Sequence, residues 1–471
     1  MDFLEMQPPT ILVIGDIILD VNIYGSVNRI ANEAPVPVLV YKNETRKLGG
    51  CGNVLMNLQG IGCSRLFLIS MIGNDKHGKE IHDIISSYPD ISPTFYTDNE
   101  YTTTVKTRGF SNKKIVLRYD IEKRVSLLKK HIDSCKERIE ILLKETKLDS
   151  IILSDYNNGF LVEELTQYVI TEASKYNIPV FVDPKIDYRK YIGCTVFKPN
   201  IKEMKDIFGI DYSYEKLEEI HKSIQSKVSS KETIITLSEN GISYLTDGGN
   251  LIHKRTVSTE VSDVTGAGDI VISIIAYFYK NMQKETLVEL ATWLGTHSVK
   301  HVGTYVIKKM DILEAFRSIR KTKLITSDSL LNFNQPFLIT NGCFDIVHEG
   351  HLALFNYCRS IATEGGSVVV ALNSDESIRR LKASTRPINS LKSRIALLNQ
   401  IDSIDWIVVF DEDTPSELFK KVHPNVLVKG GDYKEGDLIG REFCREVRIF
   451  NYIEGKSTTS IIKQIQELKN E

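Results

Sequence analysis

The sequence predicts an α/β protein with a doubly wound sheet and a small β flap, followed by a smaller, Rossmann-like α/β domain. Three observations support this fold class. Short β-rich runs alternate with amphipathic stretches, two strand-like segments early in the chain interrupt that rhythm, and the alternation restarts after a polar segment that ends in proline. The chain of 471 residues has room for roughly two to four domains, each with its own core.

The composition indicates a cytoplasmic globular protein. Hydrophobic residues make up 42% of the chain and charged residues 25%, and the formal net charge of -2 gives no general attraction to nucleic acid. The seven cysteines form no C-x-x-C pair, which argues for reduced thiols without a zinc site. The start of the chain lacks the features of a signal peptide, and no apolar run is long enough to span a bilayer. We therefore expect small-molecule partners, with neither nucleic acid nor a membrane among them.

Residues 1–320 form the first predicted domain. Buried strands separated by helices predict a parallel sheet that binds its ligands at the carboxyl ends of the strands. The predicted strands are 11–15, 150–154, 179–183 and 233–237, and the predicted helices include 161–175 and 266–279.

Two segments, 36–41 and 103–119, read as strands with no helix between them, and predict an antiparallel flap on one edge of the sheet. The segment 32–38 contains two prolines, which cannot donate hydrogen bonds to a neighbouring strand. We therefore expect an edge strand there.

The polar segment 321–336 reads as a linker, and 337–471 as the second domain. In the second domain the predicted strands are 337–340, 367–372, 406–410 and 426–429.

A small-residue turn leads into an apolar helix in the first domain. Backbone N–H groups of Gly266, Ala267 and Gly268 can converge on an anion there, aided by the helix dipole. Asp269 follows in the first helical turn, where a carboxylate can take the proton of an attacking alcohol. The alternative is an ordinary glycine-rich turn whose aspartate caps the helix.

The string Asn200-Ile201-Lys202-Glu203 follows another predicted strand. Asn200 and Glu203 share one helix face and could hold Mg²⁺ through water and the phosphates of ATP. The alternative is a helix cap with a capping carboxylate.

Further candidates could contact a polar ligand directly. Gly49 and Gly50 open a helix where bare backbone can approach a ligand, and Asn53 follows. Asp16 and Asp20 come just after the first strand, where carboxylates can bind sugar hydroxyls; either could instead be a turn or capping residue.

Together these residues resemble the ribokinase-like carbohydrate kinase family over roughly residues 8–320. The resemblance implies Asp269 as catalytic base, 266–268 as anion hole, 200–203 at Mg·ATP, and Asp16, Gly49, Gly50 and Asn53 around the sugar. Val264 stands where the family usually has threonine, which leaves the anion hole and base intact. The family's flap covers the sugar and often forms a dimer contact, so the resemblance also implies a homodimer.

Two histidines in the second domain flank Gly350 just before a predicted helix. The spacing of His348 and His351 places both imidazoles on one face near the helix N-terminus. As imidazolium or neutral imidazole, they can stabilise charge on an α-phosphate and on departing pyrophosphate. The alternatives are a zinc pair or two surface histidines, but H-E-x-x-H spacing is absent.

Near the chain end, Ser457, Thr458 and Thr459 precede a predicted helix and could form a second phosphate cradle or an ordinary N-cap. With the string from Asn341 through Gly342 and Phe344 to His351, they resemble the cytidylyltransferase-like superfamily over about 337–471. By resemblance, Lys382 and Arg386 contact phosphates or substrate, and Lys429, Gly430 and Asp432 shape the nucleotide side.

The order of the two domains resembles the bifunctional heptose enzymes of lipopolysaccharide precursor synthesis. That resemblance implies ATP-dependent phosphorylation of D-glycero-β-D-manno-heptose 7-phosphate at O1, and transfer of AMP to heptose 1-phosphate. A separate phosphatase must act between the steps. The basic segment 105–118, with Arg108, could bind the 7-phosphate or could be a solvated strand. A different sugar, or a GDP- or CDP-sugar product, is the alternative.

Overall fold

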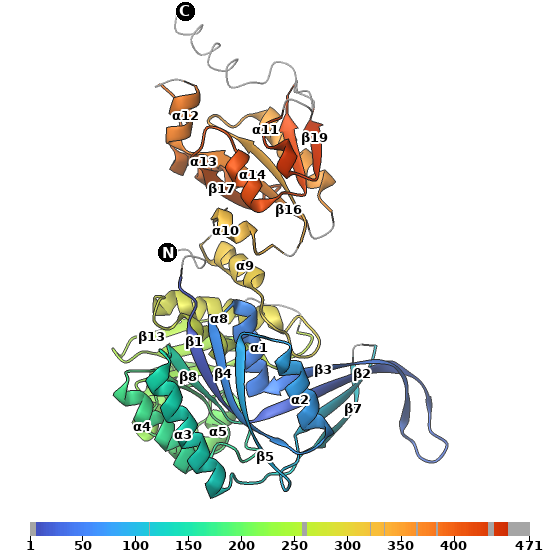
Figure 1. The fold of residues 1–471 in the computed structure, drawn as a ribbon, viewed down its shortest axis with the longest axis vertical. Coiled ribbons are helices and arrows are strands. Elements are labelled where there is room, and N and C mark those ends of the chain that lie inside the picture. Colours follow the sequence, from blue (N-terminus) through green and yellow to red (C-terminus); the bar gives the residue numbers. More distant parts are fainter. Residues whose placement is uncertain are drawn as a thin grey trace, which may run out of the picture. The chain divides into compact units, whose positions relative to one another are not determined.

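The computed structural model describes residues 6–112, 114–256, 261–320, 322–333, 335–363, 366–382, 385–431 and 438–450 (Figure 1). The chain divides into two compact units: one comprises Gln7–Ala315, and the chain from Phe316 onward belongs to the other.

A largely parallel sheet forms the centre of the first unit. Among the described residues it has nine strands in the order β13-β12-β11-β10-β9-β8-β1-β4-β5. Only the pairs of β12 with β11 and β13 are antiparallel. The four strands predicted for this sheet are confirmed. Bounds are β1 Thr10–Gly15, β4 Arg65–Gly73, β5 Ile91–Asp98, β8 Ser150–Ser154, β9 Val180–Asp183, β10 Val196–Phe197, β11 Glu232–Thr236, β12 Ile242–Leu245 and β13 Leu251–Lys254.

Helices cover both faces of this sheet, so its central strands are buried on both sides and read as unbroken apolar runs. Leu12 and Ile14 of β1 belong to a core that includes residues of α3, α4 and α6, whereas α1 and α7 contact β1 and β8 on the opposite face. Bounds are α1 Cys51–Ile61, α2 Lys76–Ser86, α3 Lys129–Glu145, α4 Glu163–Lys175, α5 Ile201–Phe208, α6 Leu217–Val228, α7 Ala267–Phe278, α8 Lys284–Ser298 and α9 Lys309–Arg320.

The predicted flap is a separate sheet with strand order β3-β2-β6-β7 (Figure 1). Its central pair, β2 with β6, is parallel, so the prediction of an antiparallel flap holds only for the two outer pairs. β3 (Pro37–Gly50) lies at its edge, as the prolines predicted. β2 (Ile17–Ile30) was not predicted, because polar residues such as Asp20 and Asn22 interrupt the apolar alternation of a half-buried strand. Both side chains are nevertheless buried, so this face of the flap is polar inside the fold. The other two strands are β6 Val105–Ser111 and β7 Lys114–Ile121.

The second unit contains a parallel sheet of six described strands, ordered β14-β17-β16-β15-β18-β19. β14 lies inside the segment predicted as a linker, where Leu324 pairs with Ile407 at the sheet edge. Two residues give no periodic signal, so sequence alone could not show this strand. Bounds are β14 Leu324–Ile325, β15 Phe337–Gly342, β16 Ser367–Asn373, β17 Trp406–Phe410, β18 Val426–Gly430, β19 Glu446–Phe450, α10 Ser327–Leu330, α11 Glu349–Ile361, α12 Asp375–Leu381, α13 Leu391–Leu398 and α14 Ser416–Val422.

Single 3₁₀ turns lie at Tyr188–Tyr191, Tyr214–Lys216, Ser238–Asn240 and Arg441–Phe443.

Among the helices in the described part of the chain, none combines the length and apolar character needed to span a bilayer.

Candidate active sites

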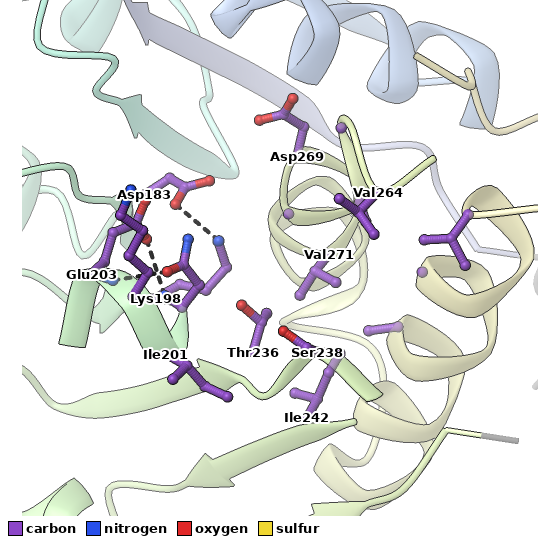
Figure 2. A pocket seen from close by; sticks show the side chains of 18 of the residues that line it. Asp183, Lys198, Ile201, Glu203, Thr236, Ser238, Ile242, Val264, Asp269 and Val271 are labelled. Atoms are coloured by element: carbon purple, nitrogen blue, oxygen red, sulfur yellow. Dashed lines mark hydrogen bonds and ion pairs between the residues drawn. The ribbon is translucent and has the colours of Figure 1, made fainter. Parts of the chain in front are cut away.

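A cavity of 1210 Å³ in the first unit is lined by the carboxyl-terminal ends of sheet strands together with α5, α7 and α8. Figure 2 shows its two kinds of lining side chain. Apolar side chains from several elements form one part, and charged or hydroxyl side chains form the other. This combination suits a ligand that has a flat apolar group joined to anionic groups. The labelled lining residues are Asp183, Lys198, Ile201, Glu203, Thr236, Ser238, Ile242, Val264, Asp269 and Val271.

Asp269 lies at this cavity, in the first turn of α7, where the sequence placed it. The turn before it requires glycine. Gly266 has φ +84°, and a Cβ there would lie 2.7 Å from Nδ2 of Asn53. The predicted anion hole, residues 266–268, therefore reaches the cavity as bare or nearly bare backbone at a helix N-terminus.

Two side chains from distant elements hold the Asp269 carboxylate. Nδ2 of Asn53 donates to Oδ2 and the hydroxyl of Tyr156 donates to Oδ1, each at 2.7 Å. Burial raises the pKa of Asp269, and the two hydrogen bonds and Lys198 oppose that rise. A buried carboxylate fixed in this way is suited to act as a general base.

Replacing Tyr156 with phenylalanine removes one of these donors. Because the lost hydrogen bond stabilised the carboxylate, the pKa of Asp269 should rise further, and the acidic limb of the pH profile for the expected phosphorylation should move to higher pH. The test is the pH dependence of kcat/KM for phosphorylation, measured from about pH 5 to about pH 9 in the variant and the wild type. An unchanged profile would show that Tyr156 does not tune the base.

Sequence reasoning missed two charged residues that line the polar part of the cavity. Nζ of Lys198 lies 2.9 Å from Oδ1 of Asp183, and both line the cavity. Burial raises the pKa of Asp183, and the nearby carboxylates raise that of Lys198, so the lysine stays charged. Both residues lie at the carboxyl ends of strands, Asp183 ending β9 and Lys198 following β10, and that position was the available signal.

Asn200 and Glu203 form a reciprocal capping box at the start of α5, as the alternative interpretation expected, and both residues also line the cavity. Glu203 N donates to Oδ1 of Asn200 at 2.8 Å, and Asn200 N donates to Oε2 of Glu203 at 3.0 Å. The other carboxylate oxygen, Oε1, pairs with Lys185 at 3.1 Å. Within the described residues no three acidic, histidine or cysteine side chains are grouped closely enough to hold a metal ion. Ile201 and Lys202 also line the cavity.

The structure changes the interpretation of Asp16. Its Oδ2 accepts from the backbone N–H groups of Tyr156 and Asn158 at 2.9 and 3.1 Å, and its Oδ1 accepts from that of Phe160 at 3.2 Å. The side chain is 1% exposed, and burial, with the charge of Asp155, raises its pKa to about 6. Asp16 therefore holds the loop that carries Tyr156, and its oxygens are not open to a sugar.

The remaining predicted sugar residues come together on the inner side of the flap. Nη1 of Arg108 lies 2.6 Å from Oδ1 of Asp20, and both side chains are buried, so Arg108 is not on a solvated strand. A Cβ on Gly49 would collide with the Asp20 carboxylate, and Gly50 adopts φ +60° before α1. Asn53 lies in α1, which begins directly after Gly50, and donates a hydrogen bond to Asp269. The predicted sugar residues of the flap therefore lie next to the predicted catalytic base.

In the second unit, His348 and His351 meet at the N-terminus of α11, as predicted. Their rings stack with centroids 3.8 Å apart at an angle of 24°. Phe344, with φ +43°, packs edge-on against His351 and is buried. Burial lowers the pKa of both histidines, that of His351 to about 4, with a further contribution from His348. The structure thus favours neutral imidazoles over imidazolium. Gly350 lies between them in the first turn.

Neighbouring strands bring other predicted residues beside this pair. β15 ends with Asn341 and Gly342, and its partner β18 ends with Lys429 and Gly430. Nζ of Lys429 donates to the carbonyl oxygen of Asn341 at 3.3 Å, and burial lowers its pKa to about 8. Lys382 is exposed at the end of α12.

A buried carboxylate holds the loop that contains Arg386. Asp345 lies 2.8 Å from Nε of Arg386 and accepts from the backbone N–H groups of Ile388 and Asn389 at 3.0 and 2.8 Å.

The predicted residues Asp432, Ser457, Thr458 and Thr459 lie outside the described residues.

Arg394 was missed by sequence reasoning, although it is fully buried. Its Nη1 donates to the carbonyl oxygens of Cys343 and Asn373, both at 2.8 Å, and its Nη2 pairs with Asp375 at 2.6 Å. It therefore fixes the turn that follows β15, within the string from Asn341 to His351. A lone arginine in the otherwise apolar run 394–398 was the only local signal.

Two family models match the chain: pfkB family carbohydrate kinase over residues 9–310, and cytidylyltransferase-like over residues 339–464. Among curated proteins, the bifunctional protein HldE of Aliarcobacter butzleri is 38% identical, covering 98% of each chain. The HldE protein of Helicobacter hepaticus is 37% identical, covering 99% of this chain and 98% of its own.

Solved structures resemble the first part of the chain. Phosphofructokinase-2 from Escherichia coli covers 67% of this chain and 100% of its own, with TM-score 0.54 and 17% identity. A sugar kinase from Clostridium perfringens, described as putative, covers 67% of this chain and 97% of its own, with TM-score 0.51 and 21% identity. At these identities the likeness supports the fold alone.

Proposed function

Because this chain belongs to the bifunctional HldE family, with a pfkB carbohydrate kinase part and a cytidylyltransferase-like part, we propose that it makes ADP-heptose in two separate steps. The kinase, assigned to residues 1–320, phosphorylates O1 of D-glycero-β-D-manno-heptose 7-phosphate with ATP. The transferase, assigned to residues 337–471, joins heptose 1-phosphate to AMP from ATP and releases pyrophosphate. The observation that carries the kinase step is the buried Asp269 at a glycine-lined helix N-terminus.

In the kinase step, Asp269 accepts the proton of the sugar hydroxyl as its oxygen attacks the γ-phosphorus. The bond from the γ-phosphorus to the bridging oxygen breaks, and ADP leaves. Backbone N–H groups of 266–268, with Lys198, stabilise the charge of the transferring group. Mg²⁺ bound with ATP would neutralise phosphate charge, and Asp183 and Glu203, whose carboxylates line the same cavity, would hold it through water.

In the transferase step, a phosphate oxygen of heptose 1-phosphate attacks the α-phosphorus of ATP, so the protein supplies no nucleophile. Neutral His348 and His351 each have one ring N–H, which can donate to the phosphates as negative charge builds on pyrophosphate. Lys429, beside Asn341, adds a cationic donor.

Two further proposals concern the surroundings of the enzyme. A separate phosphatase removes the 7-phosphate between the steps, in the cytoplasm, because the product of the first step carries a second phosphate that the substrate of the second step lacks. The flap forms a homodimer, since apolar side chains of β3 and β7 and the turn before β3 are exposed on it. These are Val36, Val40, Tyr41, Ile115, Leu117 and Tyr119.

Product analysis tests the proposed pathway. Incubation with heptose 7-phosphate and Mg·ATP should give the 1,7-bisphosphate, and ADP-heptose should appear by mass spectrometry only when a phosphatase is added. GTP and CTP serve as comparisons in the second step. Turnover of other sugar phosphates in preference to the heptose, or formation of a GDP- or CDP-sugar, would contradict the proposal.

A further inference from the structure

The flap face that carries Asp20 also carries a lysine with no carboxylate partner. In the sheet register, Lys106 of β6 lies opposite Asp20 of β2, so the two side chains project from the same face. Arg108 already engages the Asp20 carboxylate. Lys106 forms no ion pair with any residue in the described part of the chain.

Lys106 is held close to the catalytic end of the kinase site. Its Nζ lies 5.4 Å from the ring centroid of Tyr156, whose hydroxyl donates to Asp269 at 2.7 Å. The same tyrosine therefore contacts Lys106 through its ring and Asp269 through its hydroxyl. The side chain is partly buried, and burial lowers its pKa although Asp20 partly opposes this.

A second observation indicates that a polar ligand completes this face. Asn22 lies two residues after Asp20 on β2 and therefore projects from the same face; it is 3% exposed. Its Oδ1 accepts no hydrogen bond from any described residue. Buried acceptors without partners are costly, so a ligand hydroxyl that donates to this oxygen would remove the cost.

The geometry points to Lys106 as the residue that recognises the phosphate at the far end of the sugar substrate, while Asp269 acts at the hydroxyl end. Arg108 has a different task, because it neutralises Asp20 within the fold. A dianionic phosphate ester would give Lys106 a direct ion-pair partner, which it does not have among the described residues. This assignment rests on the proposed kinase function.

Replacing Lys106 with methionine tests the assignment, because methionine keeps most of the side-chain length and removes the charge. The wild-type enzyme should prefer heptose 7-phosphate to unphosphorylated heptose. Lys106→Met should lower kcat/KM for the phosphorylated sugar by about 10- to 100-fold more than kcat/KM for the unphosphorylated sugar. Lys106→Arg should retain most of the preference, and Lys42→Met, at an exposed lysine of β3, should retain all of it.

Calorimetric binding of the two sugars separates the possible failures. Equal losses of affinity for both sugars in Lys106→Met, or no loss for the phosphorylated one, would overturn the role of Lys106. If the wild-type chain binds the phosphorylated sugar more tightly, and Lys106→Met abolishes that difference, the subsite stands even if no phosphorylation occurs. The proposed kinase function would then be the part that is wrong.

Discussion

Asp269→Asn should reduce heptose 7-phosphate phosphorylation by about 10²- to 10⁴-fold, the range for loss of a general base. The amide is nearly the same size, and it can still accept from Asn53 while its NH₂ group donates to the Tyr156 hydroxyl oxygen. The change therefore removes the base with little effect on geometry. Steady-state phosphorylation, measured for the variant and the wild type at the same pH, gives the loss.

The transferase activity of the same variant is the internal control. Joining heptose 1-phosphate to AMP should proceed at the wild-type rate, because that reaction uses residues of the other compact unit. Thermal unfolding should show no loss of stability, since the variant no longer buries a carboxylate whose pKa burial raises. Loss of both activities in a folded variant would refute the two-site proposal.

His351→Ala should give the converse result, with ADP-heptose formation falling by about 10²- to 10³-fold, as when one donor to a transition-state charge is removed. Alanine also removes the ring that stacks on His348 and touches Phe344, so the neighbouring imidazole loses its support. Release of pyrophosphate in a coupled assay measures the effect, and the kinase rate should not change.

Protonation gives this prediction a second readout. Because burial lowers the pKa of His351 to about 4, wild-type adenylyl transfer should not vary with the ionisation of this residue between pH 6 and 8, roughly two units or more above that value. His423→Asn, at an exposed histidine of the same unit, is the matched control and should keep full activity. A wild-type rate that falls across this range as His351 loses its proton would contradict a neutral imidazole.

Several features could be predicted from local sequence because local chemistry determines them. Asp269 follows the small residues that let a helix N-terminus meet an anion, and it lies in the first turn of α7 as expected. His348 and His351 are three residues apart at a helix start, so their rings meet. Buried strands such as β1 and β16 read directly as apolar runs.

The partners of these residues depend on packing between distant segments. Tyr156 and Asn53 reach Asp269 across 113 and 216 residues of sequence. Asp16 looked like a ligand residue because it follows a strand, yet three backbone amides from a loop more than a hundred residues away enclose it. No short pattern records such contacts, since they form only when the sheet assembles.

The sequence by itself determined the two kinds of chemistry and their order along the chain, because each depends on a short motif with its own backbone geometry. Only the tertiary structure decided which charges are free to act. It pairs Arg108 with Asp20 and leaves Lys106 without a described carboxylate partner. It also partly buries the histidine pair, which lowers the pKa of both rings. The physical reason is that burial and pairing, which set the charge of a side chain, arise from neighbours that the chain brings together only on folding.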